Sequence, residues 1–250
     1  MEPFQVAILC ASFFVVATLY STVGHAGASG YLAMMALVGL APEVMRPTAL
    51  TLNILVAGFT VYRFRQARFF SWSGLWPFLV GSVPFAAAGG IQSLSRGAYY
   101  SAMGIVLLLA ALYLVLRAIG LRTAMPEGVV RVKKLPAVFM GCVIGFISGL
   151  IGVGGGIFLS PILLVLNWAG PKTTAGISAP FILINSAVAL AAGSLTVQTL
   201  PRELPLLAGG ALAGAFLGTW LGLERLNQKG LLMTLAFVMS LAGLKLVLTA

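Results

Sequence analysis

The chain has 250 residues, of which 60% are hydrophobic and only 8% are charged. Soluble domains carry roughly 25% charged residues, so this composition excludes an ordinary soluble domain and indicates an integral membrane protein. The net charge of +10 could suggest nucleic-acid binding, but the basic residues gather in short loops between apolar runs, which is the topology signal of a membrane protein. These runs are continuous rather than alternating, so they predict helices and not a β-barrel.

The first half begins with an apolar run, Phe4 to Val23, that leads into a glycine-rich break at residues 24–30. The next run, Tyr31 to Ala41, would rise only about 16 Å as a helix, whereas a bilayer core is about 30 Å thick. We therefore expect a hairpin in which one helix enters, the chain turns at the glycines, and a half-helix returns. Pro42 and Pro47 are expected to bracket a turn. Three spans should follow, at residues 48–62, 74–91 and 97–119.

A polar, basic linker at residues 120–134, expected in the cytoplasm, divides the chain into two repeats, 1–119 and 135–250. The second repeat has its own break at residues 152–156, and a short run follows at 157–168. The spans expected in this half are residues 135–151, which lead into the break, and then 174–192, 204–223 and 230–248.

The two halves match at a nearly constant offset, which indicates a duplication. Gly24 matches Gly152 at an offset of 128 residues, and Pro42 matches Pro171 at 129. One hairpin and three spans give each half an odd number of crossings, so the second half would lie upside down. We favour this inverted repeat over a parallel one, in which each broken segment would cross once.

The glycine breaks are the candidate binding site. A half-helix that follows a break begins with free N–H groups and about half a positive charge. Two such tips meeting at the midplane would hold a small anion without any arginine. Three consecutive glycines, 154–156, cannot share one helix face, so they favour a ligand loop, whereas glycines spaced by four (141, 145 and 149; 210, 214, 218 and 222) indicate tight helix contacts. The candidate substrate-binding residues are Gly24, His25, Gly27, Ser29, Gly30, Asn53, Ser148, Gly152, Gly154, Gly155, Gly156, Ser178 and Asn185.

The titratable side chains limit which ligands and reactions the site could support. His25, the single histidine, could couple transport to protons, contact an anion, or simply pack through a hydrogen bond. The five acidic residues lie at a terminus, in loops or at helix ends, so no carboxylate is expected at membrane depth to bind a cation or act as an acid–base pair. Basic residues are expected to avoid the interior too, with Lys245 as the one candidate exception. No metal and no cofactor are expected.

The second half resembles a known family. The run Gly145-Phe146-Ile147-Ser148-Gly149-Leu150-Ile151-Gly152-Val153-Gly154-Gly155-Gly156, followed by Pro161, Leu163 and Pro171-Lys172-Thr173-Thr174-Ala175-Gly176, is similar to the TauE/SafE family of sulfite exporter-like permeases. In the first half, Gly24-His25-Ala26-Gly27-Ala28-Ser29-Gly30 replaces the triple glycine. The resemblance implies a multi-pass permease of the bacterial inner membrane that moves sulfur-containing anions such as sulfite or organosulfonates.

The functional prediction is a secondary transporter that exports a small sulfur-containing oxyanion by alternating access. Its expected partners are that anion and the lipid bilayer, with no nucleic acid, and a homodimer is left open. A passive anion channel and a permease for another small organic anion remain alternatives. A membrane-embedded enzyme is disfavoured by the lack of a carboxylate at depth, and a structural membrane subunit is the remaining alternative.

Overall fold

The computed structural model describes residues 2–119, 127–194 and 199–224, together with 236–237, 240, 243–244 and 246–248. Seven helices in these residues are apolar and long enough to cross a membrane. They are α1 (Pro3–Ser21), α3 (Pro42–Gln66), α4 (Trp72–Ile91), α5 (Arg96–Ala118), α6 (Lys134–Ile151), α8 (Pro171–Gly193) and α9 (Leu204–Glu224). Two shorter helices, α2 (Ala28–Leu37) and α7 (Gly156–Val165), follow the two glycine breaks. The protein is therefore an all-α polytopic membrane protein, as predicted.

The span predicted at residues 230–248 falls largely outside the described residues, and Lys245 falls outside them entirely. The other predicted runs each became a helix, with ends that moved by a few residues except at the start of α3.

The predicted turn between Pro42 and Pro47 is wrong, because α3 begins at Pro42 and continues through Pro47. Proline suits the first helical position, where its missing N–H would be unsatisfied anyway. Pro47 removes one intrahelical bond, the one to the carbonyl of Glu43. That carbonyl instead accepts a hydrogen bond of 3.3 Å from the amide of Thr199. The real turn precedes the helix, at residues 38–41.

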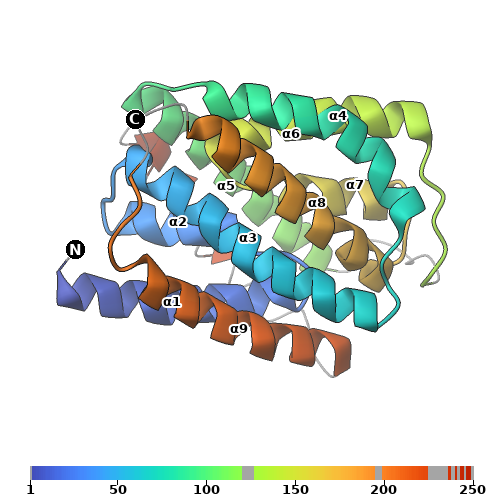
Figure 1. The fold of residues 1–250 in the computed structure, drawn as a ribbon, viewed down its shortest axis with the longest axis horizontal. Helices are drawn as coiled ribbons and strands as arrows, with labels where there is room; N and C mark the ends of the chain where they lie inside the picture. Colours follow the sequence, from blue (N-terminus) through green and yellow to red (C-terminus); the bar gives the residue numbers. More distant parts are fainter. Residues whose placement is uncertain are drawn as a thin grey trace.

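Figure 1 shows two outer pairs of helices with a third, inclined pair between them. Helices α4 and α6 lie side by side along one edge, α1 and α9 lie side by side along the opposite edge, and α3 and α8 lie between the two pairs. Close contacts at constant spacing, such as Ser82 with Gly145 and Phe14 with Gly214, show that the two helices of each outer pair run in the same direction.

The seams of both outer pairs are made by the glycines spaced four apart. A Cβ on Gly145 would overlap the carbonyl oxygen of Ser82, and a Cβ on Gly214 would overlap that of Phe14. The helix backbones thus approach more closely than a larger residue would permit. The glycines of these seams that meet a neighbouring backbone in this way are Gly81 and Gly89 of α4, Gly141, Gly145 and Gly149 of α6, and Gly210, Gly214, Gly218 and Gly222 of α9.

Helices at corresponding places in the two halves run in opposite directions. Asn53 of α3 bonds Ser186 of α8, whereas Phe64, near the end of α3, lies beside Ala175, near the start of α8, so these two helices are antiparallel. Helix α4 returns from the end of α3, while α9 runs alongside α3 in the same direction. Because α1 runs parallel to α9 and α6 runs parallel to α4, α1 and α6 also run in opposite directions. Such opposed directions are what the predicted inverted repeat requires.

Candidate functional site

The first break reverses the chain between α1 and α2. Helix α1 ends at Ser21, and α2 folds back against it. The Tyr20 hydroxyl thus lies 2.6 Å from Ser29 Oγ, and the ring centroids of Tyr31 and Phe13 lie 4.8 Å apart, with the rings tilted by 53°. The Tyr31 hydroxyl also donates a 2.7 Å bond to the carbonyl of Ala26, within the break. A short helix, held by aromatic hydroxyls, is therefore fixed behind the first turn.

The second break separates α6 from α7 by a turn that requires glycine. The last hydrogen bond of α6 is donated by the amide of Gly152 to the carbonyl of Ser148, at 2.8 Å. In the turn that follows, Gly154 and Gly155 take φ values of +73° and +81°. Side chains with a Cβ rarely adopt these values, which cost roughly 1–2 kcal/mol for an L-residue. The consecutive glycines therefore form the loop that precedes the ten-residue α7, rather than a helix contact.

The amides that begin each short helix carry no internal partner. Among the described residues, no hydrogen bond is donated by the amides of Gly154, Gly155, Gly156 or Ile157, nor by those of residues 28–30 at the start of α2. The N-terminus of a helix concentrates about half a positive charge on such groups. Each break thus presents a buried set of N–H donors suited to a negatively charged ligand.

His25 joins the first break to the second. Its Nε2 lies 3.0 Å from the carbonyl oxygen of Gly156 and 2.9 Å from Ser160 Oγ, which in turn lies 2.9 Å from Ser178 Oγ. A carbonyl oxygen only accepts, so the bond to Gly156 places a proton on Nε2. Two segments more than a hundred residues apart in the chain therefore meet at the first residue of α7.

Asn53 brings α3 and α8 to the same place. Its Nδ2 donates a 3.2 Å bond to Ser186 Oγ, and a Cβ on Gly154 would overlap Nδ2 and lie 2.9 Å from that hydroxyl. Asn53 is fully buried, and its Oδ1 has no partner among the described residues, as is also true of Ser148 Oγ. Buried polar atoms are normally hydrogen-bonded, so unpaired ones beside unpaired amides are typical of a site for a polar ligand.

The remaining predicted residues have more local roles. Gly24 packs directly on Ala175 of α8, whereas Gly27 and Gly30 let α2 approach Val16 of α1. Asn185 donates a 2.9 Å bond to the carbonyl of Phe181 in its own helix, and its Oδ1 is unpaired. Gly155 lies against Ser148, and Gly152 against Arg46.

Sequence reasoning missed four side chains at the site: Tyr20, Arg46, Ser160 and Ser186. Two of them had a signal, because Ser160 is one helical turn after Gly156 and Ser186 is next to Asn185.

Arg46 contradicts the expectation that basic residues avoid the interior. Its side chain is only 8% exposed. The guanidinium donates hydrogen bonds to the carbonyls of Gly89, Gly90 and Gln92 at the end of α4, and to Gly149 near the end of α6, at 2.6–3.1 Å. Carbonyls at helix C-termini lack intrahelical partners and carry partial negative charge, so they stabilise a cation without a carboxylate.

The comparisons with known proteins agree with this architecture. The family described as Sulfite exporter TauE/SafE matches residues 9–246. The chain is also 36% identical, over 242 residues, to the "Probable membrane transporter protein y4hK" of Sinorhizobium fredii (strain NBRC 101917 / NGR234), a match that covers 95% of this chain and 96% of the relative. No solved structure matches the chain significantly. With its apolar helices and buried polar site, the chain belongs to the TauE/SafE family and is a multi-pass bacterial membrane transporter.

Proposed function

We propose that this transporter exports a small sulfur-containing oxyanion, sulfite or an organosulfonate, by alternating access. The observation that carries the proposal is the contact of His25, in the first break, with the carbonyl of Gly156 at the start of α7. This contact brings the two breaks together, and the amides that begin α2 and α7 donate no hydrogen bond among the described residues. The name of the matching family supplies the chemical class of the anion.

The charges of the described residues favour an anion over a cation. Glu2, Glu43, Glu127 and Glu203 lie at helix ends or in loops, and none of them belongs to either break. The carboxylate of Glu127 already accepts bonds of 2.9 Å from the amides of Lys172 and Thr173 at the start of α8. A cation in the site would meet amide N–H groups, whereas a sulfite oxygen would accept hydrogen bonds from them.

The distribution of basic residues sets the orientation. One end of the bundle holds the end of α3 and the starts of α4, α6 and α8, which Lys134 over the Trp76 ring and Lys172 over the Phe69 ring bring together. The basic side chains described at this end are Arg63, Arg65, Arg68, Arg131, Lys133, Lys134 and Lys172, and those described at the other end are Arg46 and Arg202. By the positive-inside rule, the first end faces the cytoplasm. The opposite end, which holds Arg46 and Arg202, is the outer end.

His25 is the residue we propose for proton coupling, since it is the side chain at the site whose ordinary pKa lies near neutral pH. His25→Gln retains one hydrogen-bonding N–H but does not titrate. Initial rates of sulfite uptake into proteoliposomes, measured from pH 5.5 to 8.5, should lose their pH dependence in this variant. A profile identical to that of the native protein would exclude His25 from coupling.

Counterflow in proteoliposomes tests the transport mechanism. Vesicles loaded with unlabelled sulfite should accumulate radiolabelled sulfite transiently above its external concentration, because a carrier exchanges one anion for another. A passive anion channel would equilibrate the label without an overshoot. Absence of sulfite uptake in wild-type vesicles, with uptake of a carboxylate instead, would overturn the assigned substrate class.

A further inference from the structure

The two ends of the site differ at one pair of corresponding positions. Gly152 in the second break packs against Arg46 of α3, and Gly24 in the first break packs against Ala175 of α8. Gly152 corresponds to Gly24 in the other repeat, at an offset of 128 residues. Ala175 corresponds to Arg46 at an offset of 129 residues, the offset that also separates Pro42 from Pro171. A long cationic side chain at the outer end thus takes the place that a methyl group takes at the cytoplasmic end.

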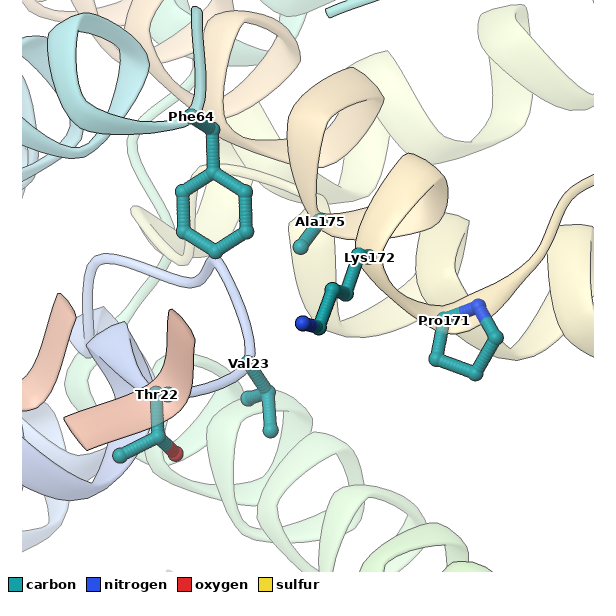
Figure 2. A pocket seen from close by; sticks show the side chains of 7 residues that line it. Thr22, Val23, Phe64, Pro171, Lys172 and Ala175 are labelled. Atoms are coloured by element: carbon teal, nitrogen blue, oxygen red, sulfur yellow. The ribbon is translucent and has the colours of Figure 1, made fainter. Parts of the chain in front are cut away.

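At the cytoplasmic end, a small hollow lies beside Ala175. Figure 2 shows a small hollow lined by Thr22, Val23, Phe64 and Ala175, with the amine of Lys172 directed into it. It has room for about one water molecule. Val23 at its wall precedes Gly24 and His25, so the hollow begins where the first break begins.

At the outer end, Arg46 fills the corresponding space and ties the halves together. It extends from α3 to the ends of α4, in its own half, and of α6, in the other. Because the guanidinium meets carbonyls alone, its charge has no carboxylate partner in these contacts, and its buried Nε has no partner among the described residues. An oxyanion can replace these carbonyls, because its charged oxygens are stronger acceptors for the same guanidinium N–H groups.

Arg46 also continues the line of polar groups away from the amides. It precedes Asn53 by seven residues, two turns of α3, so both side chains lie on one helix face. Arg46 contacts Gly152 on that face, and Asn53 lies at Gly154. An anion that leaves the amides of Gly154–Ile157 toward the outer end would pass Asn53 and then reach Arg46.

We propose that Arg46 closes the outer end of the site in this structure and becomes its anion contact when that end opens. The guanidinium then exchanges the carbonyls of α4 and α6 for the oxygens of the departing anion. This inference rests on the proposed function for the identity of the anion, but the closure of the outer end does not depend on it.

Side-specific kinetics test the anion contact. Uptake of radiolabelled sulfite is measured in right-side-out and inverted membrane vesicles that carry the native protein, Arg46→Gln or Arg46→Lys. Loss of the charge in Arg46→Gln should raise the KM at the outer face at least tenfold and change the KM at the cytoplasmic face less than twofold. Arg46→Lys, which keeps the charge but not the planar fork, should lie between the two. Equal changes at both faces, or a fall in maximal rate alone, would show a purely structural role.

Thiol labelling tests closure without any substrate. In a background with Cys10→Ala and Cys142→Ala, Ser148→Cys places a thiol next to Gly155 in the second break. A membrane-impermeant thiol reagent added outside should label this cysteine at least five times faster when Arg46 is replaced by glutamine. Equal labelling rates, in variants that elute as folded protein from size exclusion, would overturn the closure. If native vesicles carry no sulfite but labelling rises as expected, the substrate assignment fails and the closure stands.

Discussion

At the scale of single residues, Asn53 connects the helix framework to the second break. Its amide lies where a Cβ on Gly154 would have to be, and its oxygen has no partner among the described residues. A bound oxyanion near the amides of the loop would accept a hydrogen bond from the Asn53 amide, and such a bond to a charged group contributes roughly 1.5–3 kcal/mol.

Asn53→Ala should therefore raise the KM for sulfite about tenfold or more, since about 1.4 kcal/mol corresponds to a factor of ten. The measurement is the initial rate of sulfite uptake into proteoliposomes against sulfite concentration. Thr51→Ala is the control, because the Thr51 hydroxyl bonds only the carbonyl of Pro47 in the same helix, at 2.8 Å, and its loss should leave the KM within twofold. Equal KM values for native protein and Asn53→Ala would remove Asn53 from the site.

The sequence could identify His25, Asn53 and Ser178 because they are polar residues in otherwise apolar segments. It could not identify Arg46, which stands between Pro42 and Pro47 and looked like part of a loop. The burial of Arg46 depends on carbonyls of α4 and α6 that lie 43 to 103 residues further along the chain. Nothing local in the sequence indicates that those carbonyls converge there.

At the scale of helices, the glycine seams and the glycine loop use the same residue for different reasons. In the seam of α6 and α4, Gly145 lets two backbones touch, and any Cβ would overlap the carbonyl of Ser82. In the loop before α7, the backbone conformation itself requires glycine at Gly154. The spacing of the glycines distinguishes these two roles in the sequence. Glycines four residues apart lie on one face of a helix, whereas consecutive glycines do not.

Gly145→Ala should destabilise the protein by about 1–3 kcal/mol, the usual effect of overpacking a tight contact. Thermal unfolding in detergent is the measurement. Gly209→Ala is the control, because a Cβ on Gly209 would meet nothing within 4 Å and alanine favours a helix by up to about 1 kcal/mol. A melting temperature for Gly145→Ala at or above that of Gly209→Ala would contradict the tight seam.

The helix boundaries that the sequence predicted are close to those observed wherever apolar runs meet glycine or basic residues. They failed at α3, where proline was interpreted as a turn although its first occurrence is at the favoured first position of a helix. The expected half-helices after the breaks are shorter than predicted, at ten residues each.

At the scale of the whole molecule, the helix directions and the charges define two different ends. The pairing of α3 with α8 in opposite directions could not be derived from the sequence, which fixes the order of the spans but not their neighbours. The charge asymmetry could be derived from the sequence, because it depends only on which loops carry the basic residues. Both are used in the proposed alternating access, in which one half moves against the other around the site.

The orientation can be tested with two single cysteines in the background that lacks Cys10 and Cys142. Ser93→Cys lies after α4 at the outer end, and Gln66→Cys lies at the end of α3, and both positions are exposed. An impermeant thiol reagent should label Ser93→Cys in intact cells but Gln66→Cys only after permeabilisation, because the basic end faces the cytoplasm. The reverse pattern would invert the assigned orientation.

The most direct measurement is the binding of sulfite to purified protein with and without Gly154→Ala, followed as a thermal shift. A ligand at a hundred times its Kd adds about 2.7 kcal/mol to the stability of the native state, so saturating sulfite should raise the melting temperature by about 5 °C or more. Gly154→Ala should abolish this shift, because its methyl group would overlap Asn53 and strain the loop, whereas Gly58→Ala, with open space around its Cβ, should retain it. An undiminished shift in Gly154→Ala would mean that the anion is not held at the glycine loop.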